Sequence, residues 1–368
     1  MKLLWITADC FIDVDLPIVP ELSKIYDITW LIVVSSSTKI DYTQIVENRT
    51  RNLSLKIEFI NFKSRTRDIK IFFEYFSLFR KIKKQQADVI YFDFLGLPYF
   101  YFFFSRFLPL EKTIVAVHNV STPKGAINYS IAKRYTNFIL SKFKNIQVFS
   151  LSQLSALKER YEYKNVLYAP LALKNFGTSV KVPDEKITFL NFGFIRDYKR
   201  VDVLIDAAQK AFEETNVPFL VKIAGSCNDW EKYQKRIKYD FLFDLKIESV
   251  PNEDIPDLFA TSHYFVLPYQ DIAQSGALTV GLNYNLPVIV SELPAFKEFV
   301  VDKETGFFIK TADVESLKNI MIQILMNHKK IYSTLKINQQ KFVEENLSLE
   351  SIVEKYQEYI NSLVDEEH

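Results

Sequence analysis

Short apolar segments alternate with segments of helical period along most of this chain, and the alternation restarts once. In the first half, the apolar segments expected to be buried strands are 2–7, 28–34, 56–62, 88–94, 113–119, 146–151 and 165–170. Buried strands that alternate with helices are typical of a parallel sheet covered by helices on both faces. The first half is therefore predicted to be a doubly wound α/β domain.

A polar stretch, 171–186, interrupts this rhythm, and the alternation then begins again. The strands expected after it are 187–193, 219–225, 245–250, 263–269, 287–292 and 306–310, and the helices expected between them are 201–214, 229–240, 253–260, 275–284, 294–300 and 313–328. We therefore predict the α/β class, with two doubly wound parallel-sheet domains facing each other across a cleft. Ligands of such sheets bind at the carboxyl ends of the strands.

The predicted boundaries follow from this pattern. Residues 1–173 form the first domain, 174–186 a linker and 187–346 the second domain, while a polar amphipathic helix at 347–368 joins the first domain. A length of 368 residues suits two domains.

Composition excludes several classes of protein. Cys10 and Cys227 are the two cysteines, which excludes a disulfide framework, and the four histidines form no cluster with metal-ligand spacing. The N-terminal stretch is expected to be a first buried strand and not a signal peptide. No uninterrupted apolar run is long enough to predict a transmembrane helix, so we expect a cytoplasmic protein.

Charge is distributed unevenly between the halves. Residues 1–180 contain 25 Lys and Arg against 15 Asp and Glu, a net +10, and the remainder contains 21 against 30, a net −9. The segment 65–84 also mixes aromatic and cationic residues. Two interpretations stay open for it: contact with an anionic membrane at the inner face of the cell membrane, or a helix that covers the sheet and has a solvated basic face. The basic half contains no recognised nucleic-acid-binding module.

The stretch "FGFIRDYK" (192–199) places one glycine and two cations in the turn between an expected strand and helix. Gly193 would let a ligand approach the backbone closely, while Arg196 and Lys199 would suit neighbouring phosphate groups. The simpler interpretation is a solvated turn.

A second candidate anion site is the helix start at "QSGAL" (274–278). Ser275 is a plausible N-cap, and Gly276 would leave the N–H groups of the first turn uncovered, where the helix dipole favours an anion. An ordinary capped helix explains this stretch equally well.

Taken in order, these stretches resemble a family. "FGFIRDYKRVDVLIDAA", "LVKIAG", "IESVPNEDIPDLFATSHYFVLPY", "NLPVIVSE" and "ETGFFIK" are similar, over about residues 187–327, to the nucleotide-sugar-binding domain of retaining glycosyltransferases of the GT-B fold, family 4 (glycosyl transferases group 1). The ordered set is specific, although each piece alone is not.

The resemblance implies roles for individual residues. Gly193, Arg196 and Lys199 would line the donor diphosphate, and His118, at a strand end of the first half, would face the donor sugar and the acceptor. The remaining donor-site residues implied by the resemblance are Asp271, Gln274, Ser275, Gly276, Ala277, Leu278 and Thr279 for phosphate and sugar, and Gly225, Val250, Pro251 and Glu292 for base and ribose.

The sequence also departs from the family pattern. Ile272 and Val280 occupy the places of two glutamates that the family uses at the donor sugar and ribose, so Asp271 or Gln274 is the expected substitute for the first, with Glu292 near the second. The glycine-rich loop usual after the first strand is replaced by "ADCFIDVD". Its Asp13 and Asp15 resemble a metal-binding D-x-D pair at the wrong position, and we expect them on the acceptor side.

The resemblance implies transfer of a sugar from a nucleoside-diphosphate sugar to a glycan or lipid-linked acceptor, with retention, in cell-surface polysaccharide biosynthesis. It implies no metal and no other cofactor, because cations and helix N–H groups would stabilise the leaving diphosphate. The alternative is a catalytically inactive nucleotide-sugar-binding subunit of a glycan assembly complex. No nucleic acid partner is expected.

Overall fold

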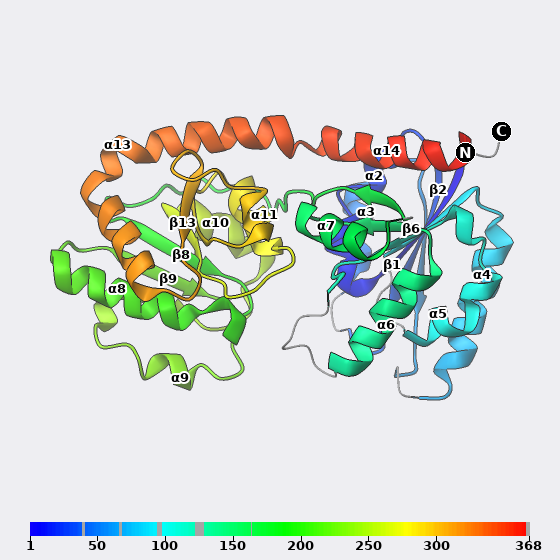
Figure 1. Cartoon of the computed structure of the whole chain (residues 1–368), viewed down its shortest axis with the longest axis horizontal. Helices are drawn as coiled ribbons and strands as arrows, with labels where there is room; N and C mark the ends of the chain where they lie inside the picture. The colour runs from blue at the N-terminus through cyan, green and yellow to red at the C-terminus, as the bar shows by residue number, and fades with distance from the viewer. Residues whose placement is uncertain (39–40, 66–67, 94–97, 122–128, 163, 366–368) are drawn as a thin grey trace. The chain divides into compact units, whose positions relative to one another are not determined.

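The computed structural model describes residues 1–38, 41–65, 68–93, 98–121, 129–162 and 164–365. The chain divides into two compact units (Figure 1), which we call unit 1 (Met1–Ala172 with Ser348–His368) and unit 2 (Leu173–Leu347). Each unit is built around one parallel sheet, and each is described separately below.

Unit 1 contains a seven-stranded parallel sheet in the order β3-β2-β1-β4-β5-β6-β7. Its strands are β1 (Lys2–Ala8), β2 (Asp27–Val34), β3 (Lys56–Asn61), β4 (Val89–Asp93), β5 (Thr113–Ala116), β6 (Asn145–Val148) and β7 (Asn165–Tyr168). Its helices are α1 (Ile12–Asp15), α2 (Val19–Leu22), α3 (Tyr42–Thr50), α4 (Ile71–Gln85), α5 (Pro98–Phe104), α6 (Tyr129–Lys142), α7 (Leu151–Arg160) and α14 (Leu349–Asp365).

Both faces of this sheet are buried, because alternate residues of its strands point into two separate apolar clusters. Along β1, Leu4 and Ile6 pack against the buried side of α4 and α5, whereas Leu3 and Trp5 pack on the opposite face with α14. Trp5 stacks on Tyr91 of β4 with ring centroids 3.6 Å apart, and Tyr356 of α14 lies against both rings. The C-terminal helix therefore completes the core of unit 1.

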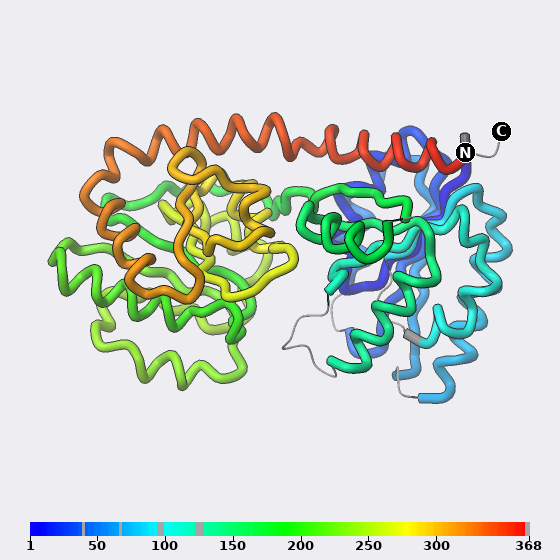
Figure 2. Tube along the Cα trace, viewed as in Figure 1, coloured from blue at the N-terminus to red at the C-terminus, as the bar shows by residue number. Residues whose placement is uncertain are grey.

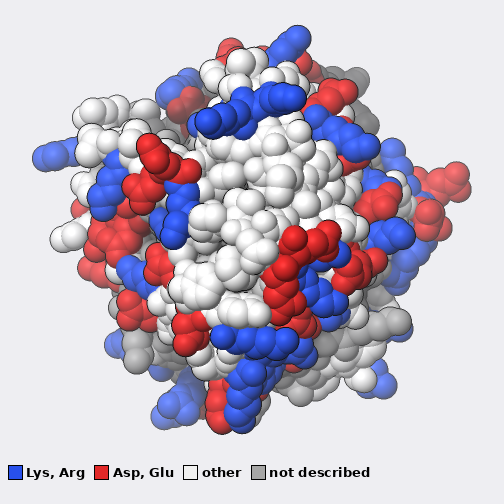
Figure 3. Space-filling view, turned by 90° about the vertical axis from the view of Figure 1, so that its left-hand side faces the viewer, with Lys and Arg blue, Asp and Glu red and all other residues white. Residues whose placement is uncertain are grey.

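Unit 2 contains a six-stranded parallel sheet in the order β10-β9-β8-β11-β12-β13. Its strands are β8 (Thr188–Phe192), β9 (Leu220–Ala224), β10 (Phe243–Lys246), β11 (Tyr264–Leu267), β12 (Val288–Ser291) and β13 (Gly306–Ile309). Its helices are α8 (Val201–Thr215), α9 (Glu231–Gln234), α10 (Ile255–Ala260), α11 (Gly276–Asn283), α12 (Pro294–Lys297) and α13 (Val314–Asn346). On the face of unit 2 that Figure 3 turns to the viewer, Lys and Arg side chains lie among Asp and Glu around an uncharged area.

The predicted fold class, two doubly wound parallel-sheet domains, is confirmed. In each sheet the strand order reverses once, between β1 and β4 in unit 1 and between β8 and β11 in unit 2. Loops leave opposite faces of the sheet at such a reversal and open a crevice at the carboxyl ends of the strands, where ligands of this fold bind. A ligand site is therefore expected at each of these two reversals.

Two helix predictions were wrong in extent. The expected helix 229–240 is reduced to α9, because the buried Gln209 side chain donates to the Arg236 carbonyl (3.0 Å) and accepts from the Lys238 N–H (2.5 Å), which holds this backbone outside a helix. The helix expected to end at 328 runs on to Asn346, since no glycine or proline interrupts it and Leu335 is buried in the unit 2 core.

Among the described residues, no helix combines the length and the apolar character needed to cross a membrane.

Candidate functional site

Two glycines let the ends of β8 and β9 approach each other at the strand reversal of unit 2. Gly193 follows β8 with φ +104°, and its N–H donates to the Ala224 carbonyl at 2.9 Å. Gly225 follows β9 with φ +148°, and a Cβ built there would lie 2.3 Å from the Gly193 carbonyl oxygen. Both positions favour glycine on backbone grounds, and at Gly225 any side chain would also push the two strand ends apart.

Lys199 is a buried cation beside this pair of glycines. A Cβ built on Gly193 would lie 3.1 Å from the Lys199 Nζ, so the ammonium faces the end of β8. Only 7% of Lys199 is exposed, and its Nζ lies 5.4 Å from the centre of the Tyr269 ring. In the part of the chain that the structure describes, no carboxylate pairs with it.

The surroundings disfavour the charged form of Lys199. Burial, and secondarily the neighbouring charge of Arg196, lower the pKa of Lys199 from 10.5 to about 8. Arg196 is exposed, with its guanidinium 4.9 Å from the centre of the Phe194 ring. A buried ammonium without a carboxylate is costly unless an anion binds it, so the site has the charge expected for a phosphate ligand.

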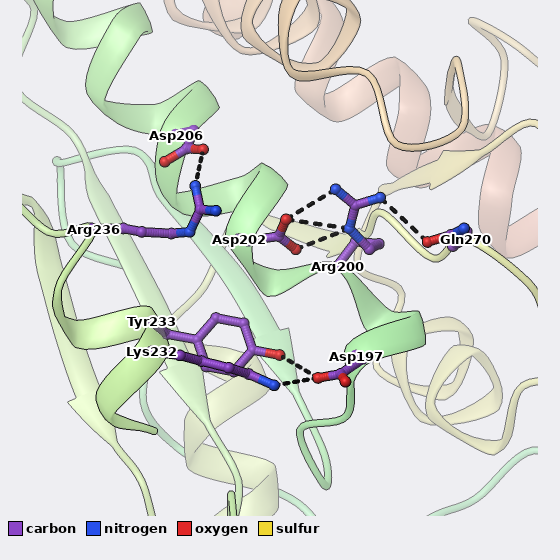
Figure 4. Close-up of polar contacts among 8 residues, drawn as sticks. All are labelled: Asp197, Arg200, Asp202, Asp206, Lys232, Tyr233, Arg236 and Gln270. Atoms are coloured by element: carbon purple, nitrogen blue, oxygen red, sulfur yellow. Dashed lines mark hydrogen bonds and ion pairs between the residues drawn. The ribbon is translucent and has the colours of Figure 1, made fainter. Parts of the chain in front are cut away.

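The turn that carries these cations is held from both sides (Figure 4). Arg200, at φ +50°, donates to both carboxylate oxygens of Asp202 and also to the Gln270 side-chain oxygen at 3.3 Å. On the other side Asp197 pairs with Lys232 and lies 3.5 Å from the Tyr233 hydroxyl. A further pair in the same view, Arg236 with Asp206, ties the loop after α9 to α8.

The loop that follows β11 is bonded directly to this turn. The Gln270 N–H donates to the Tyr198 carbonyl at 2.7 Å, and β11 pairs with β8 in the sheet. The structure thus brings the turn with Lys199 and the loop that leads to α11 together at one strand reversal, although the two are about seventy residues apart in the sequence.

The start of α11 has the predicted cap. The Ser275 hydroxyl accepts from the Leu278 N–H at 3.1 Å, and the Thr279 hydroxyl donates to the Gly276 carbonyl at 2.8 Å. A Cβ built on Gly276 would lie 3.3 Å from the Nζ of Lys174, so a second cation lies at this helix start. Ala277 follows Gly276 in the first turn.

Sequence reasoning missed Lys174, which falls in the stretch predicted to be a linker. Its contact with Gly276 joins positions about a hundred residues apart, and neither period nor motif marks it. Lys174 therefore adds a cation at the start of α11 to Lys199 and Arg196 in the turn after β8.

The departures from the expected glutamates have a packing role. Val280 is buried, and Ile272 packs partly buried against the same apolar cluster on β11 and β12. Asp271 is exposed and Gln274 partly buried, both in the loop between β11 and α11. Glu292, after β12, is exposed and pairs with Lys297 at 2.8 Å, and this contact lowers its pKa.

The residues predicted to border the base lie at the ends of the neighbouring strands. Gly225 follows β9 and is buried. Val250 is partly buried, and Pro251 is exposed ahead of the short helix that leads into α10. Their role at a base stays a prediction.

In unit 1, His118 and Asp93 form a buried pair at the carboxyl ends of adjacent strands. Asp93 ends β4 and is fully buried, and its Oδ1 lies 2.8 Å from the Nε2 of His118, which follows β5. The imidazole is stacked between Phe11 (4.1 Å between ring centres) and Phe149 (4.5 Å). Burial raises the pKa of Asp93, and the His118 partner partly opposes this.

Asp93 is a second residue that sequence reasoning missed. The available signal was an acidic residue at the end of the buried strand "DVIYFDF", where a purely structural strand would end on an apolar or turn residue.

The expected acceptor-side role of Asp15 needs correction. Asp15 is fully buried, and its Oδ2 accepts from the Thr7 hydroxyl at 2.5 Å, so its carboxyl faces the core beneath the sheet end. Burial and the charge of Asp93 raise the pKa of Asp15 well above its usual value. Asp13, on the same short helix, is exposed, and its role at an acceptor stays a prediction.

Among the described residues, no group of three or more His, Cys, Asp or Glu side chains has the arrangement of a metal site.

Comparison with known proteins now adds to this geometry. Residues 174–342 match the family model described as glycosyl transferases group 1. This part of the chain, a little under half of it, is similar to glycosyl transferases group 1 domains. It includes β8, β11 and α11, together with Lys174, Arg196 and Lys199. No curated protein sequence matches the chain significantly.

Solved structures resemble the whole chain. HepE of Anabaena, crystallised with UDP and glucose, superposes with a TM-score of 0.75 at 14% identity, covering 98% of this chain and all of HepE. Sucrose-phosphate synthase of Thermosynechococcus elongatus gives 0.74 at 13% identity and 99% of both chains. A TarM variant of S. aureus, crystallised with UDP, fondaparinux and α-GlcNAc-glycerol, gives 0.67 at 13% identity, with 98% of this chain and 99% of TarM covered. At these identities the likeness shows the fold, which is that of GT-B glycosyltransferases.

Proposed function

We propose that this protein transfers a sugar from a nucleoside-diphosphate sugar to a hydroxyl of a glycan or lipid-linked acceptor, with retention at the sugar carbon, as a member of family 4. The group 1 domain supports the transferase class, and solved neighbours with UDP, or with UDP and glucose, support a diphosphate donor. The proposal includes a role in cell-surface polysaccharide biosynthesis, which the resemblance of the motifs suggests.

The observation that carries this proposal is the buried Lys199 ammonium at the strand reversal of unit 2. A solvated turn would expose such a side chain, whereas Lys199 is turned inward against Gly193 with no carboxylate among the described residues to neutralise it. A diphosphate would supply the missing negative charge.

In the proposed reaction, the bond between the sugar carbon and the diphosphate breaks, and the oxygen of the diphosphate keeps the electron pair. Lys199 and the exposed Arg196 stabilise the negative charge that develops on this oxygen. The N–H groups at the start of α11 add hydrogen-bond donors. The acceptor hydroxyl attacks on the same face and gives its proton to the leaving phosphate oxygen. Because cations of the chain provide the stabilisation, we propose that no metal is required.

His118 is proposed to face the donor sugar and the acceptor from unit 1. Its ring orientation is fixed by Asp93 and by the two aromatic rings that enclose it, which suits a group that must hold one position relative to a sugar.

Ligand-induced thermal stabilisation tests the donor site directly. UDP, GDP, ADP and CMP are added separately to the wild-type protein and to Lys199→Ala, Arg196→Ala and, as a matched control, Lys297→Ala, whose lysine is exposed and paired with Glu292. A nucleotide at 100 times its dissociation constant stabilises the protein by about 2.7 kcal/mol. We expect stabilisation by one diphosphate, lost in Lys199→Ala and reduced in Arg196→Ala. Equal stabilisation in all variants would refute the assignment of Lys199.

A second candidate, a nucleotide-sugar-binding protein without transferase activity, is favoured by the apolar packing of Ile272 and Val280 where the family has glutamates. Incubation with the stabilising nucleotide's sugar derivatives and a panel of acceptors, followed by product analysis by mass spectrometry, distinguishes the two. Donor binding without release of nucleoside diphosphate would support the second candidate.

A further inference from the structure

Helices α4 and α5 of unit 1 lie side by side (Figures 1 and 2). Both carry several exposed aromatic side chains. The buried side of α4 is apolar, with Tyr75, Leu78 and Ile82 packed into the core. Its other side is also apolar in the first two turns, which a helix that only covers a sheet does not require. The exposed apolar residues on α4, α5 and their flanks are Ile69, Phe72, Phe73, Phe76, Tyr99, Phe102, Phe103 and Phe107.

We call these eight residues together the aromatic patch, and ring contacts join four of them, Phe72, Phe73, Phe102 and Phe103. Phe72 lies edge-on to Phe103, with ring centres 5.2 Å apart, and Phe103 contacts Phe102 at 5.4 Å. Ile69, Phe73 and Phe102 are 85%, 71% and 67% exposed. With about 200 Å² for a whole aromatic side chain, the exposed fractions of the four linked rings amount to roughly 430 Å², and the other four residues of the patch add about as much. Exposed apolar patches of a few hundred Å² on soluble monomers are often functional surfaces.

Cations continue the same side of α4 beyond the patch. From Phe73 and Phe76, spacings of three and four residues lead to Arg80, Lys83 and Lys84, which are all exposed. In the described part of the chain, none of these three pairs with a carboxylate. At the other edge, the Arg106 guanidinium lies 4.9 Å from the centre of the Phe107 ring.

The carboxylate of α4, that of Glu74, already accepts hydrogen bonds from a neighbouring segment. Glu74 accepts from the N–H groups of Lys63 (2.9 Å) and Ser64 (3.0 Å) and from the Ser64 hydroxyl (2.6 Å). Its charge is directed at the backbone after β3 and leaves the outward cations unneutralised.

We propose that the aromatic patch and the cations of α4 form a docking surface for an anionic phospholipid bilayer. Exposed aromatic rings enter the boundary between headgroups and acyl chains, and lysine and arginine beside them attract anionic headgroups. A second copy of this chain fits less well, because a symmetric contact through the patch would bring the cations of the two copies together. This inference does not depend on the transferase activity.

Flotation of the full-length protein with vesicles tests the proposal. The probes are vesicles of phosphatidylcholine alone and of phosphatidylcholine with 30% phosphatidylglycerol, each at low and high salt. The variants are an aromatic one (Phe73→Ser, Phe76→Ser, Phe102→Ser), a cationic one (Arg80→Gln, Lys83→Gln, Lys84→Gln) and a matched control in unit 2 (Phe241→Ser, Ile337→Ser), whose residues are similarly exposed.

We expect the wild type and the control to bind the anionic vesicles and not those of phosphatidylcholine alone. Each cation near the surface contributes about 1 kcal/mol, or about fivefold in affinity, so the cationic variant should bind about a hundredfold less at low salt and lose its salt dependence. The aromatic variant should be released by high salt at which the wild type stays bound. Circular dichroism and melting temperature show whether each variant is folded; the cationic variant, which changes only exposed side chains, keeps the test valid if the aromatic one is not.

Absence of wild-type binding to the anionic vesicles, or equal binding by all variants, would overturn the proposal. So would sedimentation velocity showing a dimer that the aromatic variant dissociates, because the patch would then be an interface between copies of this chain.

Discussion

The two sheets of this molecule reverse their strand order at equivalent places, yet a basic side chain is buried at one reversal and acidic side chains at the other. In unit 2 the reversal between β8 and β11 holds Lys199 buried, with Arg196 in the same turn. In unit 1 the reversal between β1 and β4 holds two buried carboxyls, Asp15 and Asp93. The same backbone arrangement therefore supports two kinds of chemistry. The reversal in unit 2 suits a bound anion, whereas Asp93 in unit 1 orients His118. What distinguishes the units is the side chains that follow the strands.

Asp93→Asn should have the largest effect on the proposed activity, because it replaces the carboxyl partner of His118 with an amide of the same shape. We expect sugar transfer to fall about 10- to 100-fold, a typical effect for a positioning group. Binding of UDP, measured by calorimetry, should be unchanged, since the anion site belongs to unit 2.

A further readout separates positioning from folding in this variant. Asp93→Glu, which restores a carboxyl group beside His118, should recover part of the activity. A loss of UDP binding that matched the loss of transfer would contradict this division of labour between the units.

The affinity for UDP should depend on pH through Lys199, whose ammonium must be charged to bind a diphosphate. Its pKa in the free protein is about 8, so affinity should be constant below pH 8 and fall by up to about tenfold per pH unit above it. Calorimetric titrations between pH 6.5 and 9.5 measure this. Lys199→Arg, which stays charged throughout, is the control, and a wild-type affinity independent of pH would argue against Lys199 as the ligand.

The smallest expected effect is on the free energy of unfolding. Loss of the Lys199 charge should weaken UDP binding but stabilise the ligand-free fold. Because the folded protein lowers the pKa of Lys199, the unfolded chain binds this proton more tightly, and the charge destabilises the fold at pH 7. Lys199→Met should therefore raise the free energy of unfolding of the ligand-free protein by about 1 kcal/mol. The gain should shrink as the pH rises from 8 towards 10.5. Urea unfolding at pH 7 and 9.5 measures it, and a destabilised variant at pH 7 would show that Lys199 has a stabilising partner.

The fold could be predicted from the sequence because a buried parallel strand is a short run of apolar residues, which can be recognised without knowledge of its neighbours in the sheet. The apolar segment 2–7 corresponds to β1 and 187–193 to β8, with ends shifted by one residue. Helix extent was less predictable where distant side chains compete for the backbone, as Gln209 does after α9.

The candidate site was predictable only where its parts are contiguous. Gly193 and Lys199 stand six positions apart in one turn, so their proximity follows from the sequence. The contacts of Lys174 with Gly276 and of Asp93 with His118 join separate strand–helix units. Strand order decides them, and a period of apolar residues carries no information on strand order. The burial of Asp15 was missed for the same reason, since it depends on the packing of α1 over the end of β1.

Because Gly225 lies so close to Gly193, the position of the Lys199 ammonium depends on residue 225 having no Cβ atom. One added methyl group at position 225 would collide with the backbone of Gly193, against which the Lys199 Nζ is placed. Gly225 need not touch a ligand to affect its binding. The room for sequence change in this loop is therefore smaller than its polar contacts alone would suggest, and a search for variants with altered donor preference should leave this glycine fixed.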